Sequence, residues 1–366
     1  MMTSRERFVN VLTGRPVDRV PFMKVFGGTN AVLPRWLQER PGLDREIDAL
    51  LQFEGRYRGW DCPPVNLDLS CVNTWEIVAE DAETRTARRP DGMVKLFVKG
   101  CDFHHQTIEF PVKGRADWER IKARFLDPDD PARFPGNWDD LVARYRGRDW
   151  PLQLTHRGVY GIPRVLMGDE ALAFAFYDDP ALVHDIMDTY TDFAIRVWEK
   201  MVRVVDFDLV ECWEDMASKN GALISPAMVR EFMAPNYRKI RAFAEAHGIP
   251  IVLVDSDGNT MAMAEVMLEA GVNAMYPWEV LAGNDVDALR ERLPGMAAVG
   301  GLRKEAMAEG PAAVEAEMVK AARLIRKGRF IPGPDHFVQS HTSWEQYRYF
   351  MQRLREVVLA TPVESP

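Results

Sequence analysis

From about residue 150 onward, short apolar runs alternate with longer stretches of helical periodicity, and this alternation constrains the fold more than any other feature. Strands that alternate with helices in this way are typical of parallel βαβ units. The apolar runs are Pro151–Thr155, Asp208–Cys212, Pro250–Val254, Asn273–Tyr276, Met296–Val299 and Arg329–Ile331. The helical stretches are Pro180–Val205, Pro226–His247, Met261–Ala270, Val286–Arg292 and Pro311–Lys327. The sequence therefore predicts a parallel sheet covered by helices.

The first part of the chain is less regular but supplies two further candidate strands. Arg19–Val25 is a short apolar run, and Trp60–Leu67 is a second one that adjacent prolines interrupt. Helical periodicity is found over Thr3–Thr13 and Leu43–Arg58. Adding the two runs to the six later ones gives eight strands, which predicts an α/β fold of the (β/α)8 TIM-barrel type with an N-terminal extension.

One segment departs from this pattern. Residues 93–112 contain two partly alternating runs joined by a polar loop, which indicates a β-hairpin inserted over about residues 90–115. No G-x-G-x-x-G follows any predicted strand, which disfavours a dinucleotide-binding fold. We therefore predict a single barrel domain over residues 1–366 that carries this insertion.

Composition and charge exclude several classes of protein. The chain has 366 residues with 46 Lys and Arg against 55 Asp and Glu, a net charge of −9, and no basic run suited to nucleic acid. No apolar run approaches the length of a membrane span, and the polar N-terminus lacks a secretory signal. The four cysteines show no paired spacing, which fits a reducing compartment. We expect a cytoplasmic protein that binds neither nucleic acid nor membrane.

The ends of the predicted strands carry most of the candidate functional residues, because the loops of a barrel converge at the carboxyl ends of its strands. Asp255 and Asp257 follow the fifth strand and His336 follows the eighth. Two carboxylates and an imidazole form a plausible set of ligands for a divalent metal such as zinc. We therefore predict Asp255, Asp257 and His336 as a metal or polarising group, with Asp255 and His336 as catalytic residues.

Further candidates at the same edge would bind substrate. They are Lys24, His156, Glu214, Trp278 and Arg303. His156 or Arg303 would supply positive charge or hydrogen bonds there.

Structural roles are open alternatives for several of these residues. Asp257, with the Gly and Asn that follow it, also suits a turn and a helix cap. His336 could be a structural hydrogen-bonding residue. Glu214 could form an ion pair with Lys219 or Arg230.

An ordered set of short motifs resembles the uroporphyrinogen decarboxylase superfamily, which contains the heme-pathway decarboxylase and corrinoid-dependent methyltransferases. The resemblance runs over nearly the whole chain. Its motifs are Arg19-Val-Pro-Phe, Gly168-Asp-Glu-Ala-Leu, Tyr177-Asp-Asp-Pro180, Glu214-Asp-Met-Ala, Ile224-Ser-Pro226, Phe232-Met-Ala-Pro235, Gly300-Gly-Leu, Ile331-Pro-Gly-Pro-Asp-His336 and Ser343-Trp-Glu345. The resemblance implies a barrel fold and a homodimer, but it does not choose between the two activities.

Specific positions separate the branches of this superfamily. The decarboxylase has an arginine-rich segment after the first strand, where this chain reads Lys24-Val-Phe-Gly-Gly-Thr-Asn30 and lacks those arginines. Its essential aspartate is matched by Asp68, and its late histidine by His336. The thiol methyltransferases bind zinc through His-x-Cys and a late Cys, and the resemblance puts Asp255, Asp257 and His336 at those positions.

The resemblance and the strand-end residues together favour an enzyme that moves a methyl group between a small O- or N-methylated substrate and a corrinoid carried by a partner protein. Asp255, Asp257 and His336, with or without a zinc ion, would polarise the leaving atom, and Asp68 would orient the substrate. Two alternatives remain open. One is a tetrapyrrole decarboxylase that uses Asp68 and needs no cofactor, and the other is a non-catalytic barrel that binds a corrinoid or another ligand.

Overall fold

The computed structural model describes residues 2–25, 32–54, 59–69, 74–100 and 105–364. The chain divides into two compact units, and each is described by itself. The first unit contains residues 1–63, 141–155 and 205–366, and the second contains residues 64–140 and 156–204.

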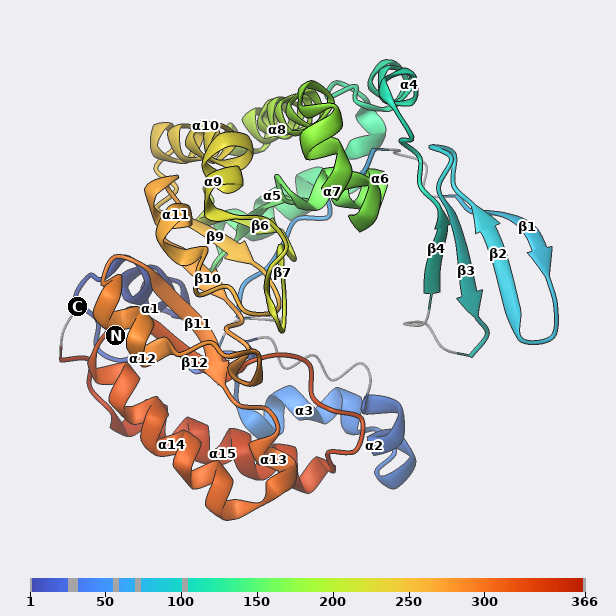
Figure 1. Cartoon of the computed structure of the whole chain (residues 1–366). Coiled ribbons are helices and arrows are strands. Elements are labelled where there is room, and N and C mark those ends of the chain that lie inside the picture. Colours follow the sequence, from blue (N-terminus) through green and yellow to red (C-terminus); the bar gives the residue numbers. More distant parts are fainter. Residues whose placement is uncertain (1, 26–31, 55–58, 70–73, 101–104, 365–366) are drawn as a thin grey trace. The chain divides into compact units, whose positions relative to one another are not determined.

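A six-stranded sheet forms the centre of the first unit, with the strand order β12-β11-β10-β9-β6-β5 (Figure 1). Its strands are β5 (Gln153–His156), β6 (Leu209–Trp213), β9 (Ile251–Asp255), β10 (Ala274–Tyr276), β11 (Ala297–Leu302) and β12 (Phe330–Pro334). The pairs from β6 to β12 are parallel. All six strands predicted after residue 150 are confirmed, and neighbours in the chain are neighbours in the sheet.

Helices connect these strands and cover the sheet, because each has an apolar side that must be buried. Helix α10 packs against β6 and β9, α12 against β11, and α14 against β12. The helices of this unit are α1 (Ser4–Thr13), α2 (Leu33–Glu39), α3 (Leu43–Leu51), α9 (Pro226–Met228), α10 (Ala234–Ala246), α11 (Ala264–Glu269), α12 (Val286–Arg292), α13 (Ala306–Glu309), α14 (Pro311–Arg326) and α15 (Trp344–Ala360). Short elements complete it: the strands β7 (Ala217–Ser218) and β8 (Gly221–Ala222), the π-helical turn Val229–Met233 and the 3₁₀ turn Val280–Ala282.

The two predicted N-terminal strands are replaced by extended segments, at least over the described residues. Asp61 forms an isolated parallel bridge with Leu152, and adjacent prolines end the pairing because they lack the N–H of a ladder. The backbone of Phe22 bonds to Glu54 instead of to a neighbouring strand. Val25 lies against Gly333 of β12, where a Cβ on the glycine would be 2.6 Å from that of Val25. One extended segment thus borders each edge of the sheet, as in a (β/α)8 fold with irregular first strands.

Polar side chains inside the sheet are paired with one another. Glu211 of β6 accepts hydrogen bonds from the Tyr276 hydroxyl and from Gln153 Nε2, the latter at 2.5 Å. Gln153 Oε1 in turn accepts one from Trp60 Nε1 at 2.5 Å. Because a buried carboxylate is costly unless it is hydrogen-bonded, this network explains how a charged residue is accommodated within a buried strand.

The second unit combines a four-stranded antiparallel sheet with helices. The sheet has the order β1-β2-β3-β4 and contains β1 (Glu76–Glu80), β2 (Thr84–Arg88), β3 (Val94–Val98) and β4 (His105–Glu109), as Figure 1 shows. The predicted hairpin corresponds to β3 and β4, and it belongs to a larger sheet than the sequence indicated. The helices are α4 (Arg115–Phe125), α6 (Gly161–Met167), α7 (Asp169–Asp178) and α8 (Pro180–Val202), with a 3₁₀ turn over Pro131–Arg133. Helix α5 (Trp138–Arg146) spans the point where the chain passes to the first unit.

None of the helices in the described ranges combines the length and the apolar character that crossing a bilayer requires.

Candidate functional site

Asp257 and His336 meet at the carboxyl edge of the six-stranded sheet. His336 Nε2 lies 3.0 Å from Asp257 Oδ2. Asp257 follows β9 and His336 follows β12, and these strands are three positions apart in the sheet. On a flat sheet three strand spacings amount to about 14 Å. The contact shows that the loops after these two strands converge at one edge of the sheet, as in a barrel, and it brings together two of the three residues predicted as a polarising group.

The two members of this pair are held differently. The side chain of Asp257 is 38% exposed and that of His336 22% exposed. Asp257 Oδ1 is shielded from solvent and has no hydrogen-bond partner among the described residues. Burial of the His336 ring lowers its pKa, but the hydrogen bond and charge of Asp257 outweigh burial, so the net pKa of His336 is raised. The pair therefore holds a proton on the imidazole up to a higher pH than an isolated histidine would.

A lysine and three carboxylates lie beside this pair. Lys304 Nζ is 3.4 Å from Glu279 Oε1, 3.3 Å from Glu305 Oε1 and 3.6 Å from Asp335 Oδ1. Burial alone would lower the pKa of Lys304, but the charges of Asp335, Glu305 and Glu279 raise it above the usual range. The ammonium is therefore charged, and carboxylates outnumber it at this edge.

Asp335 anchors the loops around these residues. It is fully buried, and its carboxylate accepts hydrogen bonds from the backbone of Val280 at 2.7 Å and of Lys304 at 3.0 Å. Burial raises the pKa of Asp335, although Lys304 and the backbone donors oppose this. The residue thus fixes the loops after β10 and β11 next to His336, and its role is to position them.

Glu214 and Asp255 are more deeply placed than the sequence indicated. Glu214 is fully buried, and its carboxylate accepts a hydrogen bond from the hydroxyl of Tyr237 on α10. Burial and then the charge of Glu214 raise the pKa of Tyr237 well above its usual value. Asp255 is 5% exposed, and its carbonyl accepts from the Glu214 amide at 2.8 Å. Both lie beneath the surface at which Asp257 and His336 meet.

Three other predicted residues are placed less favourably for substrate binding. Trp278 is 1% exposed, and its Nε1 donates to the Met275 carbonyl at 2.7 Å. Arg303 is paired with Glu309. Lys24 is half-buried on the segment that borders β12, and it makes no ion pair with a described residue. Lys304, one residue after Arg303, is the cation found among the site carboxylates.

The division between the units falls just before the last residue of β5, so His156 is counted with the second unit, as is Asp68. His156 is fully buried beside Tyr190 and Trp198, and neither ring nitrogen has a hydrogen-bond partner among the described residues. Burial lowers its pKa to about 3, which disfavours the first of the two roles predicted for it, positive charge or hydrogen bonds. Asp68 is partly exposed and accepts two hydrogen bonds from Arg157, at 3.0 Å and 2.5 Å, on one carboxylate oxygen.

The described residues do not fit a three-ligand metal centre. Within the ranges that the structure covers, no group of three or more His, Cys, Asp or Glu side chains is arranged to hold a metal ion. Asp257 and His336 instead contact each other directly, through Asp257 Oδ2 and His336 Nε2.

The structure bears on two of the structural roles considered for these residues, the ion pair of Glu214 with Arg230 and the turn at Asp257. Arg230 pairs with Glu269 on a neighbouring helix at 3.0 Å, rather than with Glu214. The turn interpretation of Asp257 and its neighbours is confirmed in part, because Gly258 has a positive φ of 81° and Asn259 accepts from the Met261 amide.

The fold and this site define a (β/α)8-type protein with a polar site at the carboxyl ends of its strands. The uroporphyrinogen decarboxylase (URO-D) family matches residues 164–357, which is more than half of the chain. The protein therefore belongs to the URO-D family.

A solved structure of another protein shows the same fold. A methyltransferase from Methanosarcina mazei superposes with a TM-score of 0.62 at 16% identity, over 98% of each chain. A protein described as a vitamin-B12-independent methionine synthase from Listeria monocytogenes gives a TM-score of 0.33 at 12% identity, over 59% of this chain and 69% of the other. A 3-keto-L-gulonate-6-phosphate decarboxylase from Vibrio cholerae gives 0.24 at 11% identity, over 60% and 88%. No curated protein sequence matches the chain.

Proposed function

We propose that this protein is a methyltransferase that moves a methyl group between a small O- or N-methylated substrate and a corrinoid carried by a separate protein. The observation that carries the proposal is the contact of Asp257 with His336 at the carboxyl edge of the sheet. The likeness in fold to a methyltransferase supports it, as does the segment that begins at Lys24 without the arginines a porphyrinogen would need.

The leaving atom of the methyl donor determines what chemistry the site must supply. An alkoxide or phenoxide is a poor leaving group, so a proton delivered in the transition state accelerates its departure. His336 is suited to this role, because Asp257 raises its pKa above the ordinary histidine value and so favours the protonated imidazolium. As the bond between the methyl carbon and oxygen breaks, the proton passes from His336 to the oxygen. The methyl group bonds to the acceptor cobalt, which contributes the electron pair.

Asp257 supports this step by stabilising the imidazolium before it gives up its proton. The carboxylates around Lys304 outnumber its charge, so the edge favours a neutral or cationic methyl donor over a polyanionic one. Under this proposal Asp255 and Glu214 support the loops from below. A role for Asp68 in orienting the substrate stays a prediction.

The experiment uses the purified full-length chain with free cob(I)alamin as the methyl acceptor. Candidate donors are a methylated aromatic ether and a methylated amine, and the readout is the spectral change from cob(I)alamin to methylcobalamin. We expect one class of donor to react, and His336→Ala and Asp257→Ala to slow that reaction. Asp149→Asn is the matched control, because Asp149 is exposed and has no ion pair among the described residues. Failure of every donor would contradict the proposal.

A decarboxylase is the second candidate, and the partly exposed Asp68 next to Arg157 is the observation that favours it. The same preparation is therefore incubated with uroporphyrinogen, and release of carbon dioxide is measured. Decarboxylation that Asp68→Asn abolishes and His336→Ala spares would replace the methyltransferase assignment. If neither reaction occurs but a corrinoid binds stoichiometrically, the protein is a binding component.

A further inference from the structure

A cavity lies at the edge of the six-stranded sheet opposite to Asp257 and His336, at the amino ends of its strands. Its volume is about 530 Å³, within the range typical of small-molecule sites. Pro250, Asn273 and Arg329 stand immediately before β9, β10 and β12, and Gly295 stands two residues before β11. The site of Asp257 and His336 follows the carboxyl ends of the same strands, so the two sites are separated by the length of the sheet.

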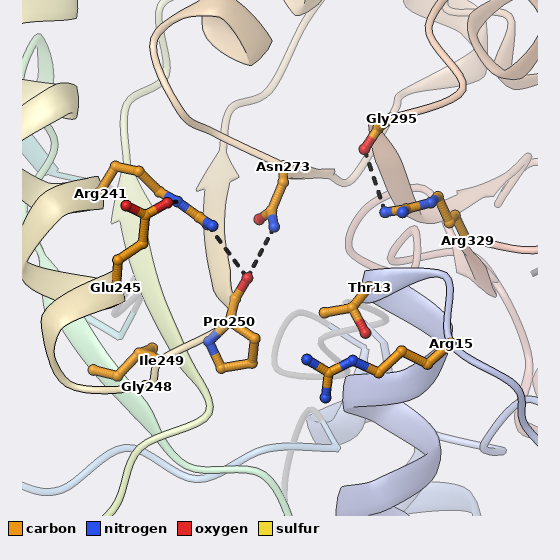
Figure 2. A pocket seen from close by; sticks show the side chains of 10 residues that line it. All are labelled: Thr13, Arg15, Arg241, Glu245, Gly248, Ile249, Pro250, Asn273, Gly295 and Arg329. Atoms are coloured by element: carbon orange, nitrogen blue, oxygen red, sulfur yellow. Dashed lines mark hydrogen bonds and ion pairs between the residues drawn. The ribbon is translucent and has the colours of Figure 1, made fainter.

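The cavity has an excess of positive charge. Three arginines and one glutamate line it, namely Arg15, Arg241, Arg329 and Glu245. Figure 2 shows Arg15 and Arg241 directed from different sides toward Pro250. Arg241 is balanced by Glu245 at 2.8 Å. Arg15 is exposed, and its side chain makes no hydrogen bond or ion pair with a described residue.

Arg329 is built into the wall of the cavity. It is half-buried, and its Nη1 donates to the carbonyl oxygens of Leu12 at 3.1 Å and Gly295 at 3.5 Å. Its guanidinium lies over Gly14, where a Cβ would be 2.6 Å from Nε. Gly14 therefore leaves the room that the guanidinium fills. No carboxylate of the described residues pairs with Arg329, so its charge is held in place without a counter-charge.

Arg290, a buried arginine outside the cavity lining, adds to the uncompensated positive charge near Arg329. Arg290 is 8% exposed, and its Nη1 donates to backbone carbonyls, including that of Met296 at 2.6 Å. Its Nε has no hydrogen-bond partner among the described residues. Burial and then the charge of Arg329 lower the pKa of Arg290 to about 10. Two arginines that repel each other without an adjacent carboxylate are stabilised by an anion that binds nearby.

We propose that this cavity binds a small phosphorylated compound through Arg15, Arg241 and Arg329. Planar guanidinium groups bind phosphate oxygens in pairs, which favours arginine over lysine for this task. The cavity is larger than an inorganic phosphate ion requires, so it leaves space for the organic part of the ligand, next to Ile249 and Pro250. The proposal does not depend on the reaction at the carboxyl edge.

The experiment titrates the full-length protein with inorganic pyrophosphate by isothermal titration calorimetry, at low and at high salt. We expect one molecule to bind per chain with a Kd of about 1 mM or tighter, and binding to weaken as salt screens the charges. Arg15→Ala and Arg241→Ala should each weaken it about tenfold or more, as expected for a lost hydrogen bond between charged groups. Arg15 is exposed, so its replacement leaves the fold intact.

Two controls make the test specific. Arg45→Ala removes an exposed arginine of α3 that has no ion pair among the described residues, and it should leave binding unchanged. His336→Ala should also leave pyrophosphate binding unchanged, which distinguishes this cavity from the site at the other edge. The proposal is wrong if the wild-type protein shows no saturable binding, or if Arg45→Ala weakens it as much as Arg15→Ala.

Discussion

Replacing Asp257 by Asn should remove a pH-dependent contribution of His336 to stability. Burial alone lowers the pKa of His336, but the hydrogen bond and charge of Asp257 raise it above its ordinary value in the folded protein. In the unfolded chain a histidine has a pKa of about 6.5. Because the folded pKa is the higher one, the stabilisation is complete below about pH 6.5 and is lost as the pH rises through the folded pKa.

The size of this contribution follows from the geometry of the pair. The two atoms lie 3.0 Å apart, and the side chains are 22% and 38% exposed, so water screens the interaction. Coulomb's law with the dielectric constant of water gives about 1.4 kcal/mol at this distance. Measured couplings of exposed ion pairs are about 0.2–1 kcal/mol. We therefore expect the pair to contribute about 1 kcal/mol to the free energy of unfolding when His336 is protonated.

The assay is urea denaturation of the wild type, Asp257→Asn and the control Asp149→Asn, at several values between about pH 6 and about pH 9. The difference in free energy of unfolding between the wild type and Asp257→Asn should shrink as the pH rises. The control should follow the wild type at every pH. A difference that stays constant across the range would show that Asp257 does not hold the proton on His336.

Three further substitutions test how the first unit is held together, each by chemical denaturation. Asp208→Ala should lower the free energy of unfolding by about 3–5 kcal/mol, because it removes the carboxylate that lies 2.9 Å from the buried guanidinium of Arg148. A loss below about 1 kcal/mol would contradict this. Tyr237→Phe should lower the free energy of unfolding by about 1–3 kcal/mol, because it removes the hydrogen bond from the tyrosine hydroxyl to buried Glu214. An unchanged free energy of unfolding would show that this hydrogen bond is not formed. Gly258→Ala should lower the free energy of unfolding by about 1–3 kcal/mol, because Gly258 has a φ of 81° and the new Cβ would lie 2.7 Å from backbone atoms of Ala217. Unchanged stability would show that the loop rearranges to accept the methyl group.

Much of the sheet could be predicted from the sequence, because a parallel strand buried on both faces is a short apolar run. Such runs stand out clearly at β9 and β11, where every residue is buried. The prediction of two N-terminal strands was wrong, although their apolar residues are buried as expected. The prolines near Phe22 and Asp61 cannot donate a backbone hydrogen bond and so prevent a continuous ladder, and an apolar run in the sequence does not show whether a ladder forms.

The candidate site could be predicted in outline. The rule that loops converge at the carboxyl ends of strands was enough to bring Asp257 and His336 together. The rule could not separate exposed from buried side chains. It therefore placed His156 among the candidates for positive charge or hydrogen bonding, although burial lowers the pKa of its imidazole and disfavours the charged form. It also favoured Arg303 over Lys304, since two adjacent cations look alike in sequence and only the packed loops show which one meets the carboxylates.

Tyr237 was missed because it lies on helix α10 and not at a strand end. Its partner Glu214 was predicted from its position after β6, but the sequence does not show that the carboxylate turns inward to the helix. The cavity at the amino ends of the strands was missed for a related reason. Arg15, Arg241 and Arg329 are far apart in the chain and show no common motif.

The pH dependence of methyl transfer to cob(I)alamin tests the central claim most directly, because His336 must be protonated before it can donate a proton to the leaving oxygen. We predict that the rate is highest while His336 is protonated and falls as the pH rises through its raised pKa. Asp257→Asn should shift this fall to lower pH, and His336→Ala should slow the reaction and remove the fall. A rate in His336→Ala equal to that of the wild type, with the same pH profile, would contradict the account.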